Sequence, residues 1–126
     1  MAINPKTPGL HHVNLRCSNL NASKKFYGDV IGFPIVIDTP ELFAFPIGNV
    51  FIVFKESAQN AKFDPFTVGT DHLAMASESE DELQRVAKGL NDAGIENTGM
   101  KTDPVLQKQY VAFKDPDRIQ WEFYMI

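Results

Sequence analysis

The chain has 126 residues, 44% of them hydrophobic, which suffices for one domain or for two small modules that share a core. A net charge of −4, with the basic residues scattered, excludes a surface that binds nucleic acid or anionic membrane through clustered Lys and Arg. The single cysteine, Cys17, excludes an internal disulfide and a cysteine-rich zinc site. No segment has the roughly 20 apolar residues of a transmembrane helix, and no signal peptide is recognisable, so we expect a cytoplasmic protein.

The first expected element is a strand over residues 10–17. Polar and apolar side chains alternate along it, so His12 and Asn14 share a polar face. His11 has the parity of the apolar face, and we interpret it as a structural or partly exposed residue. Cys17 lies on the apolar face too, where a small buried side chain is expected rather than a nucleophile.

A helix should follow this strand, because apolar residues then recur at helical spacing. Asn19 and Asn21 are both suitable N-caps, and Gly32 stands where a C-terminal cap belongs. Breaks at Pro40 and Gly48 divide the next stretch into short strands. These strands are expected over residues 33–38, 42–46 and 49–55.

The same order begins again after a polar linker over residues 57–70. Residues 71–76 read as a strand with His72 on its polar face. Ser79, followed three residues later by a glutamate, forms a capping-box pattern that predicts the start of a helix, and Gly94 ends it. The remaining predictions are a loose stretch over residues 97–108 and two strands over residues 109–114 and 119–124.

The two halves therefore repeat one order of elements, with His12 and His72 at matching places. Neither half alone could bury both faces of its sheet, so we expect the two modules, residues 9–56 and 71–126, to pair within one domain over residues 9–126. The predicted fold class is α+β, with the helices on the apolar faces of the sheets. The polar faces are expected to line one shared concavity.

The last strand carries the residue that indicates chemistry. Its apolar residues point to one side, whereas Gln120, Glu122 and Tyr124 point to the other. An ionised glutamate among aromatic residues must reach water or a cation, and two neutral imidazoles with one carboxylate match the triad that holds a divalent metal with open positions. We therefore predict that His12, His72 and Glu122 bind a divalent metal, namely iron, manganese or zinc. The alternative is that the histidines are hydrogen-bonded sheet residues and the glutamate reaches water at a sheet edge.

Residues 10–20, residues 26–33 and the closing Asp-Pro-Asp turn with Glu122 form a specific combination of motifs. Over nearly the whole chain this combination resembles the vicinal oxygen chelate superfamily, which includes glyoxalase I, the bleomycin and fosfomycin resistance proteins and the extradiol dioxygenases. The resemblance implies two βαβββ modules whose sheets form a cup around a metal, and it places metal ligands on the same three residues. It is specific for the fold and not for the reaction.

Departures from the family's patterns narrow the choice among the reaction types of the family. The fourth ligand of glyoxalase I and related epimerases falls on Val53, which cannot bind metal, and the nearby Glu56 is expected past the end of its strand and outside the cup. The tyrosine of catechol-cleaving extradiol enzymes falls on Ala112, so Tyr110, two residues earlier on the same face, is the candidate catalytic residue. A fosfomycin-type transferase would need cationic side chains for its phosphonate, and the candidates are Arg16, Lys108 and Lys114.

The other inward-facing side chains are candidates for substrate contact, although each of them also fills space. The candidate substrate-binding residues are Asn14, Phe51, Tyr110, Gln120 and Tyr124. The aromatic residues that we expect in the core are Phe43, Phe45, Phe54, Phe113, Trp121 and Phe123.

Two functions of different classes follow. In the first, the chain is a small metal-dependent enzyme, of oxygenase or lyase/transferase type, whose substrate chelates the metal through neighbouring oxygens. In the second, it sequesters a planar or metal-chelating compound without catalysis, as bleomycin-resistance proteins do. Because those proteins generally need no metal ligands, the retained triad favours the enzyme. Open sheet edges and the resemblance also predict a homodimer, with modules paired within one chain or across two.

Overall fold

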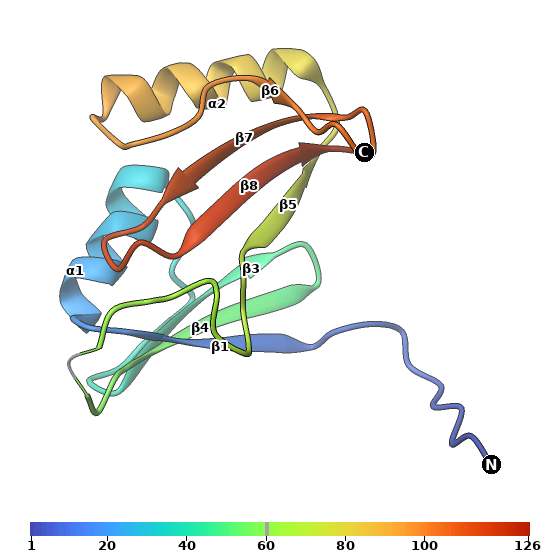
Figure 1. Cartoon of the computed structure of the whole chain (residues 1–126). Coiled ribbons are helices and arrows are strands. Elements are labelled where there is room, and N and C mark those ends of the chain that lie inside the picture. The colour runs from blue at the N-terminus through green and yellow to red at the C-terminus, as the bar shows by residue number, and fades with distance from the viewer. Residues whose placement is uncertain (60) are drawn as a thin grey trace. The chain divides into compact units, whose positions relative to one another are not determined.

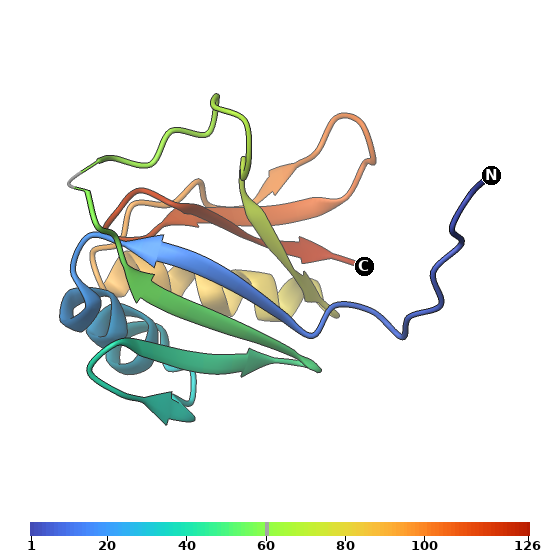
Figure 2. The same cartoon turned by 90° about the horizontal axis from the view of Figure 1, so that it is seen from below.

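The computed structural model describes residues 1–59 and 61–126, and the chain divides into two units, Met1–Asn60 and Ala61–Ile126. Each unit holds one βαβββ module with a four-stranded mixed sheet (Figures 1 and 2). The predicted α+β class and the repeated order of elements are therefore confirmed. The single domain over residues 9–126, its linker over residues 57–70 and the shared cup stay predictions, and each unit is described by itself.

The first unit contains β1 His12–Cys17, the α-helix α1 Leu20–Lys24, the π-helix η1 Lys25–Ile31, β2 Ile37–Asp38, β3 Leu42–Ile47 and β4 Val50–Glu56. Strand β1 pairs in parallel with β4, whereas β4 with β3 and β3 with β2 pair antiparallel. The sheet order is therefore β1-β4-β3-β2. An exposed tail with no helix or strand precedes β1 (Figure 2).

Local hydrogen bonds set the limits of the helical segment. Asn19 Oδ1 accepts a hydrogen bond from Ala22 N–H at 2.9 Å, so Asn19 rather than Asn21 is the N-cap. The segment starts as an α-helix and widens into η1, where Tyr27 C=O accepts from Gly32 N–H, five residues on, at 3.1 Å. Gly32 ends the segment with a φ of 98°, a left-handed conformation that favours glycine, as the predicted cap requires.

An aromatic cluster forms the core of the first unit. Tyr27, Phe43, Phe45 and Phe54 are fully buried. The ring centroids of Tyr27 and Phe54 lie 4.7 Å apart, and those of Phe43 and Phe54 lie 5.2 Å apart. The predicted core position of the three phenylalanines is confirmed, and so is the burial of Cys17.

Strand β2 is shorter than predicted, covering Ile37–Asp38 instead of residues 33–38. Phe33 N–H donates to Tyr27 C=O at 2.9 Å, so it closes the helical segment and is not available to a sheet. Pro34 has no N–H to give to a strand partner. The apolar run at residues 33–37 therefore did not distinguish helix closure from a strand.

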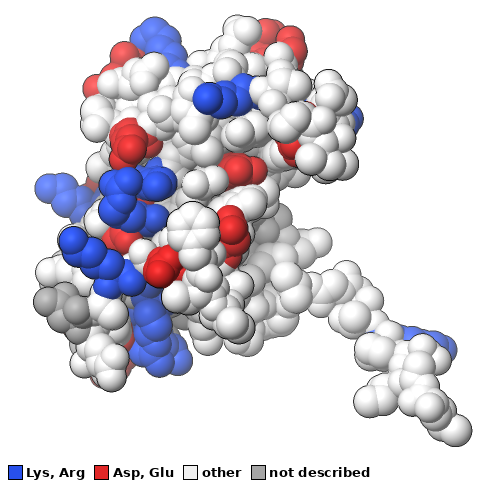
Figure 3. Space-filling view, viewed as in Figure 1, with Lys and Arg blue, Asp and Glu red and all other residues white. Residues whose placement is uncertain are grey.

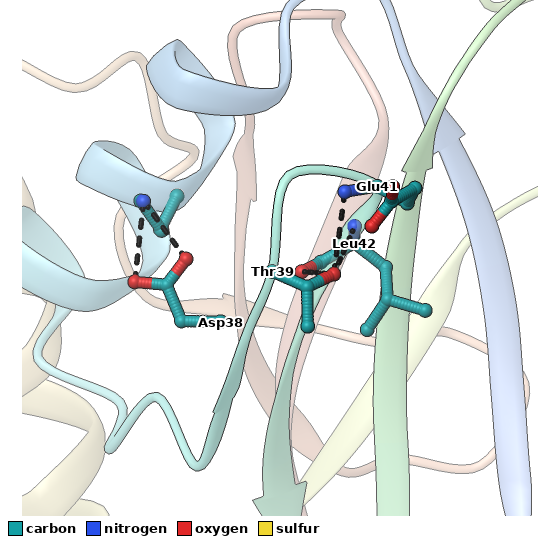
Figure 4. A network of polar contacts seen from close by, with 5 residues as sticks. Asp38, Thr39, Glu41 and Leu42 are labelled. Carbon is teal, nitrogen blue, oxygen red and sulfur yellow. Dashed lines mark hydrogen bonds and ion pairs between the residues drawn. The ribbon is translucent and has the colours of Figure 1, made fainter.

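The turn between β2 and β3 closes on one threonine (Figure 4). Thr39 Oγ1 accepts hydrogen bonds from the N–H groups of Glu41 and Leu42, both at 3.2 Å. The carboxylate of Asp38, the residue before it, pairs with Lys24 Nζ at 3.0 Å. The ion pair ties the edge strand to helix α1.

The second unit contains β5 Leu73–Ser77, α2 Glu80–Asp92, β6 Lys101–Thr102, β7 Gln109–Lys114 and β8 Gln120–Met125. Strand β5 pairs in parallel with β8, and the other pairs are antiparallel, in the order β5-β8-β7-β6. Helix α2 contacts β5 and β7 and lies along one face of this sheet (Figure 1). The predicted core residues Phe113 and Trp121 are buried, and Phe123 is half-buried.

Helix α2 begins and ends near the predicted residues. Ser79 Oγ accepts from Glu82 N–H at 3.1 Å, so Ser79 is the N-cap. Both carboxylate oxygens of Glu82 accept hydrogen bonds from Arg85, and these bonds are the main reason that the pKa of Glu82 is lowered. Because Glu82 is engaged with Arg85, only the serine half of the capping box forms within the described residues. Gly94, with a φ of 71°, follows the last turn as predicted.

The stretch over residues 97–108, predicted to be loose, contains β6 and is tied to β7. Asn97 forms an antiparallel bridge with Phe113. Thr98 N–H donates to Ala112 C=O at 2.9 Å. A strand of two residues cannot show a period in the sequence, so alternation could not reveal it.

Several other strand limits also differ from the prediction by one or two residues. Strand β1 begins at His12 rather than residue 10, and β5 begins at Leu73, so His72 lies just before it. Ile119 belongs to the turn before β8, because its N–H donates to Asp115 Oδ1 at 2.8 Å. At strand limits the alternation rule no longer fixes where a side chain points.

Charged side chains of both signs share the surface. On the face shown in Figure 3, basic side chains lie beside acidic ones. Two such pairs are Lys88 with Asp92 at 2.7 Å and Arg118 with Glu96 at 3.2 Å. Among the helices of the described residues, none has both the length and the apolar character needed to cross a bilayer.

Candidate functional site

One face of the second sheet gathers polar side chains around Glu122. Strand β8 alternates, so Gln120, Glu122 and Tyr124 share this face and the buried core lies on the other. The neighbours of Glu122 across the sheet are Ala74 on β5 and Ala112 on β7. Their short side chains leave room beside a carboxylate that is itself buried.

His72 meets this carboxylate from the residue before β5. Its Nε2 lies 3.5 Å from Glu122 Oε1, while Gln120 Nε2 donates to Glu122 Oε2 at 3.2 Å. The side chain of Glu122 is 12% exposed and that of His72 is 38% exposed, so one is withdrawn from water and the other reaches it. Two atoms that each bind a metal at about 2.1 Å lie roughly 3.0–3.4 Å apart when the angle between them is right or tetrahedral. The pair therefore fits two ligands of one divalent metal ion.

A cavity of about 450 Å³ opens beside this pair, a size that suits a small organic molecule. Two of its lining residues, Asp103 and Leu106, come from the connection between β6 and β7. The structure thus brings candidate metal ligands and candidate substrate contacts to one cavity of the second unit. Its lining residues are His72, Ala74, Asp103, Leu106, Tyr110, Glu122 and Tyr124.

Two neighbouring tyrosines line this cavity. The rings of Tyr110 and Tyr124 stack with an interplanar angle of 14° and centroids 6.1 Å apart. Tyr124 O–H donates to Asp103 Oδ2 at 2.7 Å, and this bond is the main reason that the pKa of Tyr124 rises to about 12 and the pKa of Asp103 falls. Tyr124 is therefore a neutral, engaged donor at neutral pH and not a base. Among the described residues, none forms a hydrogen bond with the Tyr110 hydroxyl, which leaves it available to a substrate.

The first unit carries the remaining candidates on the face of its sheet opposite the aromatic core. His12 and Asn14 are exposed on β1 and lie in register with Phe51 and Val53 of β4. His11 does not follow the apolar face, because its Nδ1 lies 2.9 Å from His12 Nδ1. His11 is exposed, in agreement with one of the two interpretations, and its side chain departs from the parity of the strand because this residue precedes β1.

The structure brings two of the three predicted metal ligands together. His72 and Glu122 meet in the second unit, and His12 is described with the first. Within residues 1–59 and 61–126, no three side chains of His, Cys, Asp or Glu are grouped to hold a metal ion. The three-ligand site therefore stays a prediction, and the contact between His72 and Glu122 supports two of its three ligands.

Glu56, the carboxylate near Val53 in the sequence, caps the start of α1. It is the last residue of β4, not a residue past the strand end, and its Oε1 accepts from Leu20 N–H at 3.3 Å at the start of α1. By alternation it lies on the side of Phe54, away from Val53. Arg16, a candidate for phosphonate binding, donates from Nη1 to Glu56 C=O at 3.0 Å.

Comparison with known proteins decides the family. Residues 9–123 match the model of the Glyoxalase/Bleomycin resistance protein/Dioxygenase superfamily. The chain belongs to this superfamily. The predicted resemblance to the vicinal oxygen chelate proteins is thereby confirmed. Members of the superfamily differ in function, so membership explains the fold and the site must decide the chemistry.

Relatives and solved structures of the superfamily cover nearly the whole chain. The protein YwkD of Bacillus subtilis is 28% identical over 134 residues, covering 91% of this chain and 94% of its own length. The metallothiol transferase FosB of Staphylococcus saprophyticus is 24% identical over 115 residues, covering 91% of this chain and 75% of FosB. The crystal structure of a glyoxalase family protein from Enterococcus faecalis has a TM-score of 0.78 at 26% identity, covering 93% of this chain and 97% of that one.

Sequence reasoning missed several residues of this cavity and its surroundings. Asp103 and Leu106 lie in a stretch without a period, and only the fold of the β6–β7 connection brings them to the cavity. Asp71, expected as the first residue of a strand, precedes β5, and its Oδ1 lies 2.6 Å from His72 Nδ1. An Asp-His dipeptide at the start of a strand is the signal that could have indicated this contact.

Proposed function

We propose that this superfamily member is a small metal-dependent enzyme, with a divalent metal bound by His12, His72 and Glu122. The observation that supports the proposal best is the 3.5 Å approach of His72 Nε2 to Glu122 Oε1 at the wall of a cavity. A carboxylate withdrawn from water needs positive charge, and among the described residues its hydrogen-bond donor, apart from the imidazole, is the neutral Gln120 amide. A divalent cation between the two side chains would meet that need.

The residues of the chain would divide the work as follows. When bound, the metal supplies a Lewis acid for an oxyanion, or a redox centre if it is iron, for a substrate that chelates it through neighbouring oxygens. Gln120 fixes the orientation of the Glu122 carboxylate through its second oxygen. Tyr110, which lines the same cavity, is the candidate proton donor or acceptor. Tyr124 contributes a neutral aromatic side chain to the cavity lining, and we propose that Asn14 and Phe51 contribute substrate contacts from the first unit.

The reaction class is proposed from what the site contains. Val53 in place of a fourth ligand disfavours the isomerase type, which leaves oxygenase and lyase or transferase types. FosB is a metallothiol transferase, which supports the transferase type. The described residues that line the cavity include the carboxylates of Asp103 and Glu122 and no Lys or Arg, so an anionic substrate would depend on the metal for its charge.

The stacked tyrosines favour a second candidate function. Tyr110 and Tyr124, whose rings are nearly parallel, both line the cavity, and aromatic side chains suit a planar compound that is held and not turned over. This is the sequestering function of the bleomycin-resistance type. It requires no metal, so metal content separates the two candidates.

The test is metal content by elemental mass spectrometry of untagged protein purified without chelators. We expect about one iron, manganese or zinc per chain, and a large loss in His12→Ala, because a third of the donor set is removed. Iron would favour oxygen chemistry, whereas zinc or manganese would favour lyase or transferase chemistry. Absence of metal from both proteins, even after reconstitution with each ion, would support the sequestering function instead.

We also propose that the protein is a homodimer. The outer edges of both sheets, β1 and β2 in the first unit and β5 and β6 in the second, have one strand neighbour each in the described residues. Open edges favour pairing with a second chain. Light scattering of the purified protein is expected to give twice the chain mass, and the mass of one chain would contradict the proposal.

A further inference from the structure

We propose that the side chain preceding each candidate ligand histidine is a positioning residue that holds the ring through Nδ1 and leaves Nε2 to the metal. The proposal rests on the proposed function for the role of the metal. It does not rest on that function for which nitrogen of each histidine carries the proton. In each module, the side chain of the preceding residue contacts Nδ1 of the candidate ligand histidine. Asp71 Oδ1 lies 2.6 Å from His72 Nδ1, and His11 Nδ1 lies 2.9 Å from His12 Nδ1.

The contact of Asp71 decides which nitrogen of His72 carries the proton. An ionised carboxylate only accepts hydrogen bonds, so His72 Nδ1 must donate, and in the neutral ring Nε2 then keeps its lone pair. Nε2 is also the nitrogen 3.5 Å from Glu122 Oε1. Two electron-rich atoms at this distance, one of them on a buried carboxylate, are the arrangement that a cation between them stabilises.

In the first module, a histidine instead of an aspartate contacts Nδ1 of the candidate ligand. Only one proton fits between two Nδ1 atoms, so one ring donates and the other accepts. We assign the donor role to His12 and the acceptor role to His11 Nδ1, because this leaves His12 Nε2 free. The rings of His11 and His12 are nearly perpendicular, at 87°, and the His11 ring also lies 6.2 Å from that of Phe51. These contacts fix His11 beside the histidine that it holds.

Asp71 suits a test because its side chain is 72% exposed, so its replacement removes little packing. The metal-free protein, labelled with nitrogen-15 at its three histidines, would be studied by long-range proton–nitrogen correlation at neutral pH. We expect His72 to carry its proton on Nδ1 in the native chain. In Asp71→Ala the proton should move towards Nε2, whereas Asp71→Asn, whose amide oxygen still accepts, should keep it on Nδ1.

Zinc titration of the same proteins gives the second readout. Loss of a partner of a metal-bound histidine typically weakens metal binding about 10–100-fold, so this range is expected for Asp71→Ala and a smaller loss for Asp71→Asn. Asp81→Ala is the control, because it removes one exposed carboxylate from the first turn of α2 in the same unit. It should leave both readouts unchanged. His11→Ala should alter the His12 proton and not that of His72.

The outcomes separate this proposal from the proposed function. A native His72 with its proton on Nε2, or with protons on both nitrogens at neutral pH, would overturn the positioning role even if zinc binds. An unchanged tautomer in Asp71→Ala would do the same. The expected tautomers without any metal binding would support the positioning role and contradict the metal-dependent function.

Discussion

His72→Ala is expected to abolish metal loading while the fold is retained. The substitution removes one of the two donor atoms that lie 3.5 Å apart at the cavity. Because loss of a residue that only supports a ligand costs about 10–100-fold, loss of the ligand itself should weaken binding by more than about 100-fold. The side chain is 38% exposed and lies before β5, so the change in unfolding free energy should stay within about 0.5 kcal/mol. Elemental mass spectrometry and circular dichroism of the same sample measure the two quantities.

The matched control for this variant is Tyr110→Phe. It alters the same cavity but removes a hydroxyl that bonds to none of the described residues, so metal content and fold should both persist. If the enzyme candidate is right, its turnover should fall, because the candidate proton donor or acceptor is gone. Full metal content in His72→Ala would remove this residue from the ligand set.

Period-2 reasoning found the central part of the site because β8 is a regular strand. It separated Glu122 from the aromatic residues on the other face, and the register of β8 with β5 and β7 shows two alanines beside it. The same reasoning located the faces of β1 and β4. Regular strands and helices that are long enough to repeat their period several times can be predicted from sequence, since each residue supports the assignment of its neighbours.

The rest of the site depends on residues outside that regularity. Asp71 and His72 precede β5, and His11 precedes β1, so their side chains turn toward local partners that parity does not describe. Asp103 reaches Tyr124 across 21 positions of the chain, and no local pattern predicts such a contact. The predicted length of β2 was wrong for a related reason, because the apolar run before it closes a π-helix.

Asp115→Ala is expected to be the most destabilising polar substitution in the second unit. The Asp115 side chain is buried, and its Oδ1 accepts from Asp117 N–H at 2.9 Å and from Ile119 N–H at 2.8 Å. Its backbone closes the same turn, where Arg118 adopts a φ of 67°. An alanine would leave two backbone donors without their acceptor, and each unsatisfied buried group costs about 1–3 kcal/mol.

We therefore expect the unfolding free energy to fall by about 2–4 kcal/mol, measured by urea denaturation with a probe at Trp121, the only tryptophan of the chain. Asp115→Asn is the control, because its amide oxygen can still accept both hydrogen bonds, and its loss should be less than half as large. The turn sets where β8 begins, and β8 carries Glu122 opposite Ala74 and Ala112. Metal content should accordingly fall in Asp115→Ala in step with the folded fraction. Equal stability of the alanine and asparagine variants would show that the carboxylate oxygen does not hold this turn.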